Sequence, residues 1–260
     1  MNGNTQDLNM MDYAIRITRL HYAYPDGTHA LEAIDLDIHP GERVAIVGPS
    51  GAGKSTLLLH LNGILRGTGL VRVMGQSVMD GDLKLIRKQL GIVFQDPNDQ
   101  LFCPTVFEDI AFGPLNLGVP AQEMGKRVEK ALSDVQLDPT YATRSAHHLS
   151  HGERKRVALA CVLAMEPSIL ALDEPTSNLD PGNRRHLIRL IASLPATLIL
   201  GTHDLEMVLE LCPRTIVMDR GKIRADGETR KLLADQDLMN KHGLEVPLSL
   251  SLKRASDSVC

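Results

Sequence analysis

The chain has very few aromatic residues. It contains no tryptophan, four tyrosines and four phenylalanines among 260 residues. Few side chains can therefore stack on a nucleotide base, and Tyr24, immediately before a turn signal at residues 25–27, is the best placed of them by sequence. The alternative is a tyrosine that packs at the end of a strand.

Apolar runs long enough to cross a membrane are also missing. The longest, such as residues 157–165, fall well short of the ~18 residues that a membrane-spanning helix needs. The first residues are polar and carry no apolar secretion core. If the protein works at a membrane, we expect another chain to hold it there.

Cysteine pairs and an excess of basic charge are absent as well. The cysteines at 103, 161, 212 and 260 are scattered, with no C-x-x-C pair, which favours a reducing cytoplasm. The formal net charge of −4 gives no electrostatic reason to expect a nucleic-acid partner. An apolar content of 43% is typical of a globular protein with one large domain, or one domain and a small appendage.

The strongest motif lies at residues 48–56. It matches G-x-x-x-x-G-K-S, follows an apolar run at 44–47 that predicts a buried strand, and precedes a predicted helix. Its glycines let backbone N–H groups turn toward one point, where they and the helix N-terminus bind phosphate oxygens. Lys54 adds a charge for the β- and γ-phosphates, and the Ser55 hydroxyl can ligate Mg²⁺. The sequence predicts that a nucleoside triphosphate is bound by Gly48, Pro49, Ser50, Gly51, Ala52, Gly53, Lys54, Ser55 and Thr56.

Hydrophobic periodicity predicts an α/β protein. Alternating patterns at 14–20 and 30–38 indicate an antiparallel β region, whereas continuous apolar runs at 169–172 and 197–200 indicate parallel strands. Further strands are expected at 70–74 and 90–94, and a hairpin at 215–224. Residues 105–165 are mainly helical in pattern, punctuated by Pro114 and Pro120. The predicted helices are 81–88, 121–137, a long helix ending near 165, 183–193 and 228–239, with tails at 1–12 and 244–260.

Polar residues follow several predicted strands. Asp173 and Glu174 come directly after the run at 169–172, Gln95 follows 90–94, and His203 follows 197–200. One carboxylate at such an edge can hold Mg²⁺ and the next can orient or deprotonate water. Two acids at a strand end often occur without function, but they are far more specific when a phosphate loop precedes them.

The stretch 149–153, Leu-Ser-His-Gly-Glu, opens the long apolar-rich helix. Ser150 and Glu153 have the spacing of a capping box. Such a box can serve only to cap the helix, yet an anion-binding role is compatible with it, because a glycine beside a capped N-terminus leaves N–H groups exposed.

All four phenylalanines fall in one window, at positions 94, 102, 107 and 112. They can form the core of a helical lobe. Alternatively, they can line a surface groove that receives a helix from another protein.

Together these motifs, in this order, make residues 13–235 resemble an ATP-binding cassette (ABC) nucleotide-binding domain. The resemblance implies a P-loop fold with a RecA-like parallel sheet core, an N-terminal antiparallel β region and a helical subdomain at about 96–165, in a domain spanning 13–243. It also implies a homodimer or pseudodimer that sandwiches two ATP molecules and hydrolyses them with Mg²⁺.

The same resemblance assigns a role to each motif residue. Tyr24 stacks on adenine, Glu174 is the catalytic base, and His203 contacts the γ-phosphate. Magnesium and water are arranged by Ser55, Gln95 and Asp173. The signature residues Ser150, Gly152 and Glu153 complete the ATP site of the opposite subunit, and Asp180 links the two subunits.

Three further stretches, 24–31, 93–101 and 111–118, resemble the ATPase subunits of energy-coupling-factor importers, and 238–247 resembles the cobalt/nickel branch. This implies a chain peripheral to the cytoplasmic face of the membrane, together with an integral membrane coupling subunit and a metal-binding membrane subunit. The segment 95–112 is expected to transmit motion to the coupling subunit. The cargo is expected to be cobalt, then nickel, with a vitamin as an alternative.

The chain departs from the family signature, Leu-Ser-Gly-Gly-Gln, at His151 and Glu153. A metal site at His147, His148 and His151 is a weak alternative, because the sequence supplies no further convergent ligand. From a different class, a P-loop small-molecule kinase would use the same loop but would not need 149–153 or His203. A soluble ABC protein of DNA maintenance or translation would need a coiled-coil insertion or a second cassette.

Overall fold

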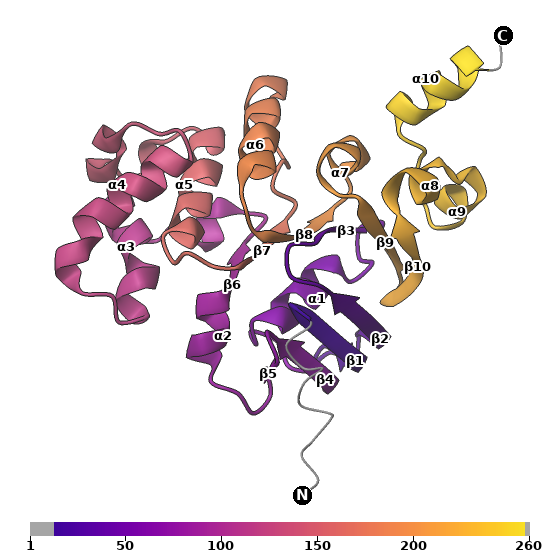
Figure 1. The fold of residues 1–260 in the computed structure, drawn as a ribbon, viewed down its shortest axis with the longest axis horizontal. Coiled ribbons are helices and arrows are strands. Elements are labelled where there is room, and N and C mark those ends of the chain that lie inside the picture. The colour runs from indigo at the N-terminus through magenta and orange to yellow at the C-terminus, as the bar shows by residue number, and fades with distance from the viewer. Residues whose placement is uncertain (1–12, 258–260) are drawn as a thin grey trace, which may run out of the picture. The chain divides into compact units, whose positions relative to one another are not determined.

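The computed structural model describes residues 13–257, so the tail predicted at residues 1–12 lies outside the described residues. The chain divides into two compact units. Unit 1 combines the described parts of Met1–Asp82 and Thr197–Cys260, and unit 2 is Leu83–Ala196. Figure 1 labels the helices and strands of both.

Unit 1 contains the antiparallel sheet that the alternating patterns predict. Its strand order is β2-β1-β4-β5, where β1 is Ile15–Ala23, β2 is His29–Ile38, β4 is Thr68–Val73 and β5 is Gln76–Ser77. Ile15 and Ile17 on β1 are buried against the core while Arg16 between them is not, as the two-residue period of a strand requires. The turn at 25–27 closes the hairpin, with the Gly27 N–H donating to the Tyr24 carbonyl over 2.9 Å.

Unit 1 also contains parallel strands. The strand β3 (Arg43–Val47) pairs in parallel with β8 (Thr197–Thr202) and β9 (Arg214–Asp219). Residues 44–47 have no exposed surface, which is why this strand reads as one continuous apolar run. The predicted hairpin is confirmed, because β10 (Lys222–Glu228) runs antiparallel to β9. Among the helices of this unit, α1 (Lys54–Leu61) and α7 (Leu205–Leu211) both contact β8.

The C-terminal part of unit 1 differs from two expectations. The single helix predicted at 228–239 is wrong: α8 (Thr229–Ala234) ends at Asp235, whose carboxylate accepts the Leu238 N–H over 3.0 Å and caps a new helix, α9 (Gln236–Lys241). The predicted tail at 244–260 contains a helix, α10 (Leu248–Asp257). It begins after Pro247, whose carbonyl accepts the N–H groups of Leu250 and Ser251.

Unit 2 contains a pair of parallel strands, β6 (Leu90–Val93) and β7 (Ile169–Asp173), flanked in sequence by α2 (Leu83–Gln89) and α6 (Pro181–Ser193). In the chain, three helices separate the two strands: α3 (Val106–Asn116), α4 (Met124–Asp134) and α5 (His151–Leu163). These helices contact one another and form a group beside the strand pair (Figure 1). Ile110, Leu132 and Val157, one from each helix, have no exposed surface, so this lobe has a core of its own.

Pro114, one of the two prolines that punctuate this helical stretch of the sequence, lies inside α3. The missing N–H removes only one backbone hydrogen bond, and the helix stops two residues later. The Leu117 N–H then donates to the Gly113 carbonyl over 3.1 Å at the C-cap.

Candidate functional site

The phosphate loop connects β3 to α1 in unit 1, in the strand–loop–helix context that the motif predicts. Two of its glycines are required by packing. A Cβ on Gly48 would lie 2.1 Å from the Met218 carbonyl oxygen, and one on Gly53 would lie 2.7 Å from the Ala30 carbonyl oxygen. Gly53 also has φ of +101°, a left-handed conformation that favours glycine, at the N-cap of α1.

Lys54 begins α1 and is buried. Its Nζ donates to the carbonyl oxygens of Gly48, over 2.8 Å, and Pro49, over 3.1 Å. The ammonium group is therefore folded over the loop itself, which carries the positive end of the α1 dipole. This combination of charge and N–H groups is suited to an anionic ligand.

Tyr24 stands one residue beyond the end of β1, where the sequence predicts it. Its side chain is 36% exposed, and its hydroxyl lies 2.9 Å from Oγ1 of Thr56 in α1. The Tyr22 ring meets the Tyr24 ring edge-on at 5.1 Å between centroids. The structure thus brings Tyr24 and Thr56 together and leaves part of the aromatic ring accessible.

His203 follows β8 directly and is exposed. In the parallel pairing of β3 with β8, Val47 is the partner of Thr202. The register therefore places the start of the phosphate loop and His203 at the same edge of the sheet, the carboxyl edge where ligands of open α/β sheets bind.

The acidic pair lies in unit 2, at the carboxyl end of β7. Asp173 and Glu174 are both buried, with exposed fractions of 8% and 7%. Val93 pairs with Leu172, so the exposed Gln95 after β6 and the acids after β7 lie at one edge of this strand pair. Glu174 has φ of +44°, a left-handed conformation that is uncommon away from glycine.

Lys155 on α5 was missed by the sequence analysis. It is only 2% exposed, and burial lowers the pKa of its ammonium group to about 8, against the opposing effect of Glu174, Asp96 and Asp173. Its Nζ donates to the Gln95 and Glu174 carbonyl oxygens and to the Ser177 hydroxyl. A signal was present, because Lys155 lies one turn before Leu159, on the apolar stripe of this helix.

The predicted capping box at the start of α5 is confirmed. The N–H and the hydroxyl of Ser150 both donate to Glu153 Oε2 over 2.7 Å, and the Glu153 N–H donates back to Ser150 Oγ over 3.3 Å. The other carboxylate oxygen accepts the Tyr141 hydroxyl over 2.5 Å. These bonds, with that from Tyr141 the largest cause, lower the pKa of Glu153. The residue that replaces the signature glutamine is therefore a hydrogen-bonded carboxylate.

Gly152 and Asp180 both lie next to the side chain of Asn183 on α6. A Cβ on Gly152 would lie 2.8 Å from Cγ of Asn183, whose amide donates to Asp180 Oδ2 over 2.5 Å. Asp180 also caps α6, accepting the N–H groups of Gly182 and Asn183. Within unit 2, the signature and the residue predicted at the dimer contact are thus joined through Asn183.

The phenylalanines lie mostly on the surface. Phe102, Phe107 and Phe112 are 62%, 37% and 49% exposed, and the rings of Phe102 and Phe112 meet edge-on with centroids 5.0 Å apart. Buried Asp109 supports this patch, since its Oδ1 accepts the N–H groups of Phe102 and Cys103. Phe94 is half-buried. The interpretation as a lobe core is therefore wrong for three of the four rings.

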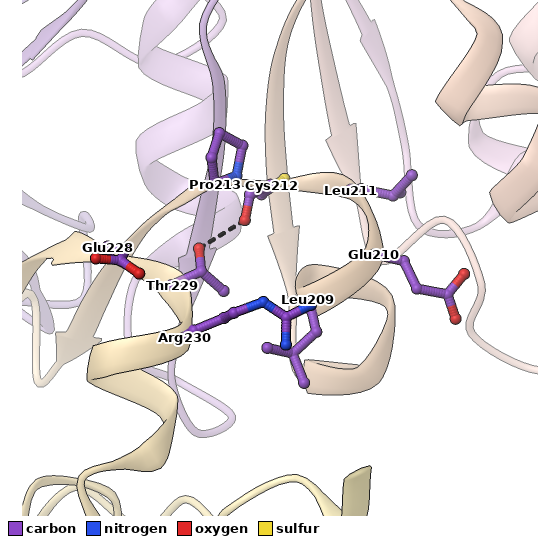
Figure 2. A pocket seen from close by; sticks show the side chains of 8 residues that line it. All are labelled: Leu209, Glu210, Leu211, Cys212, Pro213, Glu228, Thr229 and Arg230. Atoms are coloured by element: carbon purple, nitrogen blue, oxygen red, sulfur yellow. Dashed lines mark hydrogen bonds between the residues drawn. The ribbon is translucent and has the colours of Figure 1, made fainter. Parts of the chain in front are cut away.

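A groove of about 340 Å³ lies elsewhere on unit 1, between the end of α7 and the start of α8 (Figure 2). None of the predicted site residues lines it. Thr229 there donates to the Cys212 carbonyl over 2.6 Å, the bond drawn in Figure 2. In the part of the chain that the structure describes, no group of three or more histidine, cysteine, aspartate or glutamate residues is arranged to hold a metal ion. Nor does any helix within residues 13–257 have the length and apolar character to span a membrane.

A phosphate loop between β3 and α1, followed in the chain by buried acids at the end of β7, defines a P-loop nucleoside triphosphatase. The sequence profile of the ABC transporter family matches residues 31–177, and the chain belongs to this family. It is an ABC-type ATPase with the predicted fold, a mixture of parallel and antiparallel strands with helices.

Two curated relatives cover almost the whole chain. One, from Gloeobacter violaceus and provisionally named an ABC transporter ATP-binding protein, is 54% identical over 90% of this chain and 97% of its own length. The other, energy-coupling factor transporter ATP-binding protein EcfA from Methanothermobacter thermautotrophicus, is 45% identical over 92% of this chain and 78% of its own length.

Two solved structures share the fold. CbiO1 from Clostridium perfringens, described as part of the ABC transporter complex cbiONQ, has a TM-score of 0.76 and 37% identity, covering 94% of this chain and 99% of its own. The dimeric ATP-binding cassette MJ0796, in a post-hydrolysis state with ADP and Pi, has a TM-score of 0.74 and 28% identity, covering 83% of this chain and 98% of its own.

Proposed function

We propose that this chain is the ATP-hydrolysing subunit of an energy-coupling-factor importer that carries a transition-metal ion, cobalt first and nickel next. The observation that carries the importer class is the 45% identity to EcfA over 92% of the chain. The metal cargo is supported by the resemblance of residues 238–247 to the cobalt/nickel branch. Within that segment His242 has Nδ1 3.0 Å from Asp219 Oδ2, so this ring nitrogen has a partner within the chain. In this proposal the ion is recognised by another subunit.

The chemistry begins with nucleotide binding by unit 1. Tyr24 stacks on adenine, and the N–H groups of residues 48–56 bind the phosphates. Lys54 exchanges its two carbonyl partners for phosphate oxygens, which are stronger acceptors because they are charged. His203 contacts the γ-phosphate from the same sheet edge.

Hydrolysis then uses the residues of unit 2. Gln95 orients a water molecule, Glu174 takes its proton, and the water oxygen bonds to the γ-phosphorus as the bond to the β–γ bridging oxygen breaks. The products are ADP and phosphate. Ser55, Gln95 and Asp173 offer hydroxyl, amide and carboxylate oxygens, a donor set that fits Mg²⁺, and the bound ion supplies charge neutralisation on the phosphates.

Two copies of the chain form the complete ATPase in this proposal. The relative MJ0796 is dimeric. Ser150 and Gly152 of one copy contact the γ-phosphate held by the other, Glu153 holds Ser150 in place for that contact, and Asp180 links the copies. ATP binding closes the dimer, and hydrolysis removes the γ-phosphate that both copies bind, so that the dimer opens.

The exposed phenylalanines supply the contact with the membrane partners. Monomeric proteins rarely expose contiguous aromatic surface without a partner, and Phe102, Phe107 and Phe112 follow Gln95 closely in the chain. We assign to this patch the integral coupling subunit, which holds the ATPase at the cytoplasmic face of the membrane.

The first experiment tests the importer directly. The tagged chain is purified from gently solubilised membranes of its source cell, and co-purifying proteins are identified by mass spectrometry. Recovery of a small integral coupling protein and a metal-binding membrane protein supports the proposal and makes cobalt uptake the next assay, with nickel and vitamin uptake in parallel. Phe102→Ser with Phe112→Ser should abolish co-purification while ATPase activity is retained.

Two substitutions separate the ABC mechanism from that of a small-molecule kinase. Glu174→Gln should lower turnover by roughly 10²–10⁴-fold while ATP binding survives. Ser150→Arg should abolish turnover without abolishing nucleotide binding, whereas Ser133→Arg, an exposed serine on α4, should change neither. A kinase would tolerate Ser150→Arg, and unimpaired turnover in Glu174→Gln would remove the proposed base.

A further inference from the structure

Lys155 is a buried cation in the first turns of α5, the helix that begins with the signature residues. It is 2% exposed. It borders a small cavity, of about 10 Å³, whose lining includes Val93, Leu159 and Leu172. A lysine is almost never fully buried unless its ammonium group is paired, so this position calls for specific acceptors.

The ammonium group has three N–H bonds, and the structure supplies three acceptors. They are the Gln95 carbonyl oxygen at 2.9 Å, the Glu174 carbonyl oxygen at 3.1 Å and the Ser177 hydroxyl at 3.0 Å. They come from two segments of unit 2: Gln95 lies two residues beyond the end of β6, and Glu174 and Ser177 belong to the turn that follows β7. All the donors of one side chain are therefore used to join two loops, the one after β6 and the one after β7, to α5.

The acceptors are also connected to one another. The Ser177 hydroxyl donates to the Glu174 carbonyl over 2.9 Å, and the Ser177 N–H donates to the same oxygen over 3.1 Å. Lys155 thus completes a hydrogen-bonded ring around the Glu174 peptide. That peptide belongs to a residue with φ of +44°, a conformation that persists only where neighbouring contacts fix it.

We propose that Lys155 is a positioning residue for ATP hydrolysis, which holds the backbones of Gln95 and Glu174 in a fixed relation to the signature helix. Lys155 has no contact with the reacting atoms in this proposal. It acts through the two residues that the proposed function places at the water molecule, and the inference rests on those assignments. Because α5 carries both Ser150 and Lys155, a shift of this helix moves the signature and the Glu174 backbone together.

This arrangement predicts a specific kinetic effect. Lys155→Met keeps an unbranched stem of similar length but removes all three donors. With the Gln95 and Glu174 backbones released, kcat should fall by about 10- to 100-fold, since small misplacements of catalytic groups have effects of this size. The KM for ATP should stay within about twofold, because the phosphate loop and Tyr24 belong to unit 1, whereas the three acceptors that Lys155 holds all belong to unit 2.

The experiment compares purified full-length variants at saturating ATP and Mg²⁺, with nucleotide binding and thermal unfolding measured on the same samples. Lys155→Gln restores two amide donors on a shorter stem and should give a kcat between those of Lys155→Met and the wild type. Ser177→Ala removes one of the three acceptors and should have the smallest effect. Lys130→Met, an exposed lysine on α4, should match the wild type.

Glu174→Gln is measured alongside them. If its turnover collapses while that of Lys155→Met is normal, Lys155 has no positioning role. If Glu174→Gln is itself fully active, the proposed base is wrong. A merely structural lysine would lower the melting temperature of both Lys155 variants and leave kcat per folded molecule unchanged, which also overturns the inference. Should Lys155→Met fail to fold, the graded comparison of Lys155→Gln, Ser177→Ala and the wild type decides the matter.

Discussion

The side-chain oxygens of Tyr24 and Thr56 lie 2.9 Å apart and join the end of β1 to the first turn of α1. This bond orients the Tyr24 ring beside the phosphate loop while leaving 36% of the residue exposed. A base-stacking residue gains from such restraint, because a ring that is already held in place loses little conformational freedom when the ligand arrives.

The first prediction separates the ring of Tyr24 from its hydroxyl. Tyr24→Ala should weaken ATP binding by about tenfold, since stacking of a base on an aromatic side chain contributes about 1–3 kcal/mol. Tyr24→Phe keeps the ring and loses only the bond to Thr56, so affinity should change by less than about threefold while stability falls by roughly 1 kcal/mol. Fluorescent-nucleotide titration and urea unfolding measure the two effects.

Tyr13→Ala provides the control, because the Tyr13 ring packs on His39 and not on the phosphate loop. It should leave ATP affinity unchanged. Equal affinities for Tyr24→Ala and the wild type would show that adenine is held by some other group.

The Tyr24 example shows what the sequence can predict and why. Turn residues and alternation placed Tyr24 just after β1, and continuous apolar runs located β3, β7 and β8, because these signals are local. The same local signals did not reveal that the helix predicted at 228–239 is interrupted at Asp235. The helical pattern of the sequence continues through this residue, although its side chain caps a second helix. It also missed Lys155, since a lysine within an apolar stripe shows its purpose only when its three distant acceptors are known.

The phosphate loop itself provides the second prediction. Gly48→Ala should destabilise the protein by roughly 3 kcal/mol or more, because the new Cβ would lie 2.1 Å from a backbone oxygen, that of Met218, which cannot rotate away. Gly125→Ala is the matched control. That glycine lies in α4 with nothing within 4 Å of its added Cβ, so alanine there should stabilise by about 0.5–1 kcal/mol. Urea unfolding should therefore show a lower free energy of unfolding for Gly48→Ala and a higher one for Gly125→Ala. A change in the same direction in both variants would contradict the packing argument.

The third prediction concerns the carboxylate in the signature. The Tyr141 hydroxyl is the largest cause of the lowered pKa of Glu153, so Tyr141→Phe should raise that pKa toward its usual value. A carboxyl group whose pKa is lowered by folding stabilises the protein above its unfolded pKa, and this contribution disappears as the pH falls through the folded pKa.

Tyr141→Phe should therefore lower the free energy of unfolding at pH 7 by roughly 1 kcal/mol or less, and the deficit should shrink near pH 3. Urea unfolding at both pH values measures it, with Tyr13→Phe as the control. A deficit of the same size at both values would mean that Tyr141 contributes packing alone and does not stabilise the ionised form of Glu153.

The last prediction concerns His60, which lies on α1 one turn after Thr56 and is 1% exposed. Its Nδ1 lies 2.7 Å from the Thr56 carbonyl oxygen, which can only accept, so Nδ1 carries the hydrogen. Its buried Nε2 has no hydrogen-bond partner among the residues that the structure describes. Protonation would add an unpaired N–H and a charge there, and burial accordingly lowers the pKa of His60 below 6.5.

The pKa of His60 is lower in the folded state than in the unfolded state, so between these two pKa values the unfolded protein binds more protons than the folded protein. The free energy of unfolding should therefore fall as the pH drops below about 6.5, and it should level off below the folded pKa. His60→Leu should remove this part of the pH dependence, and its urea-unfolding free energy should change less between pH 7 and pH 5 than that of the wild type. His29→Asn, at an exposed position on β2, should keep the wild-type slope. If the unfolding free energy of His60→Leu changes with pH as much as that of the wild type, other groups cause the loss of stability in acid. In that case the Nε2 of His60 acquires a hydrogen-bond partner on protonation.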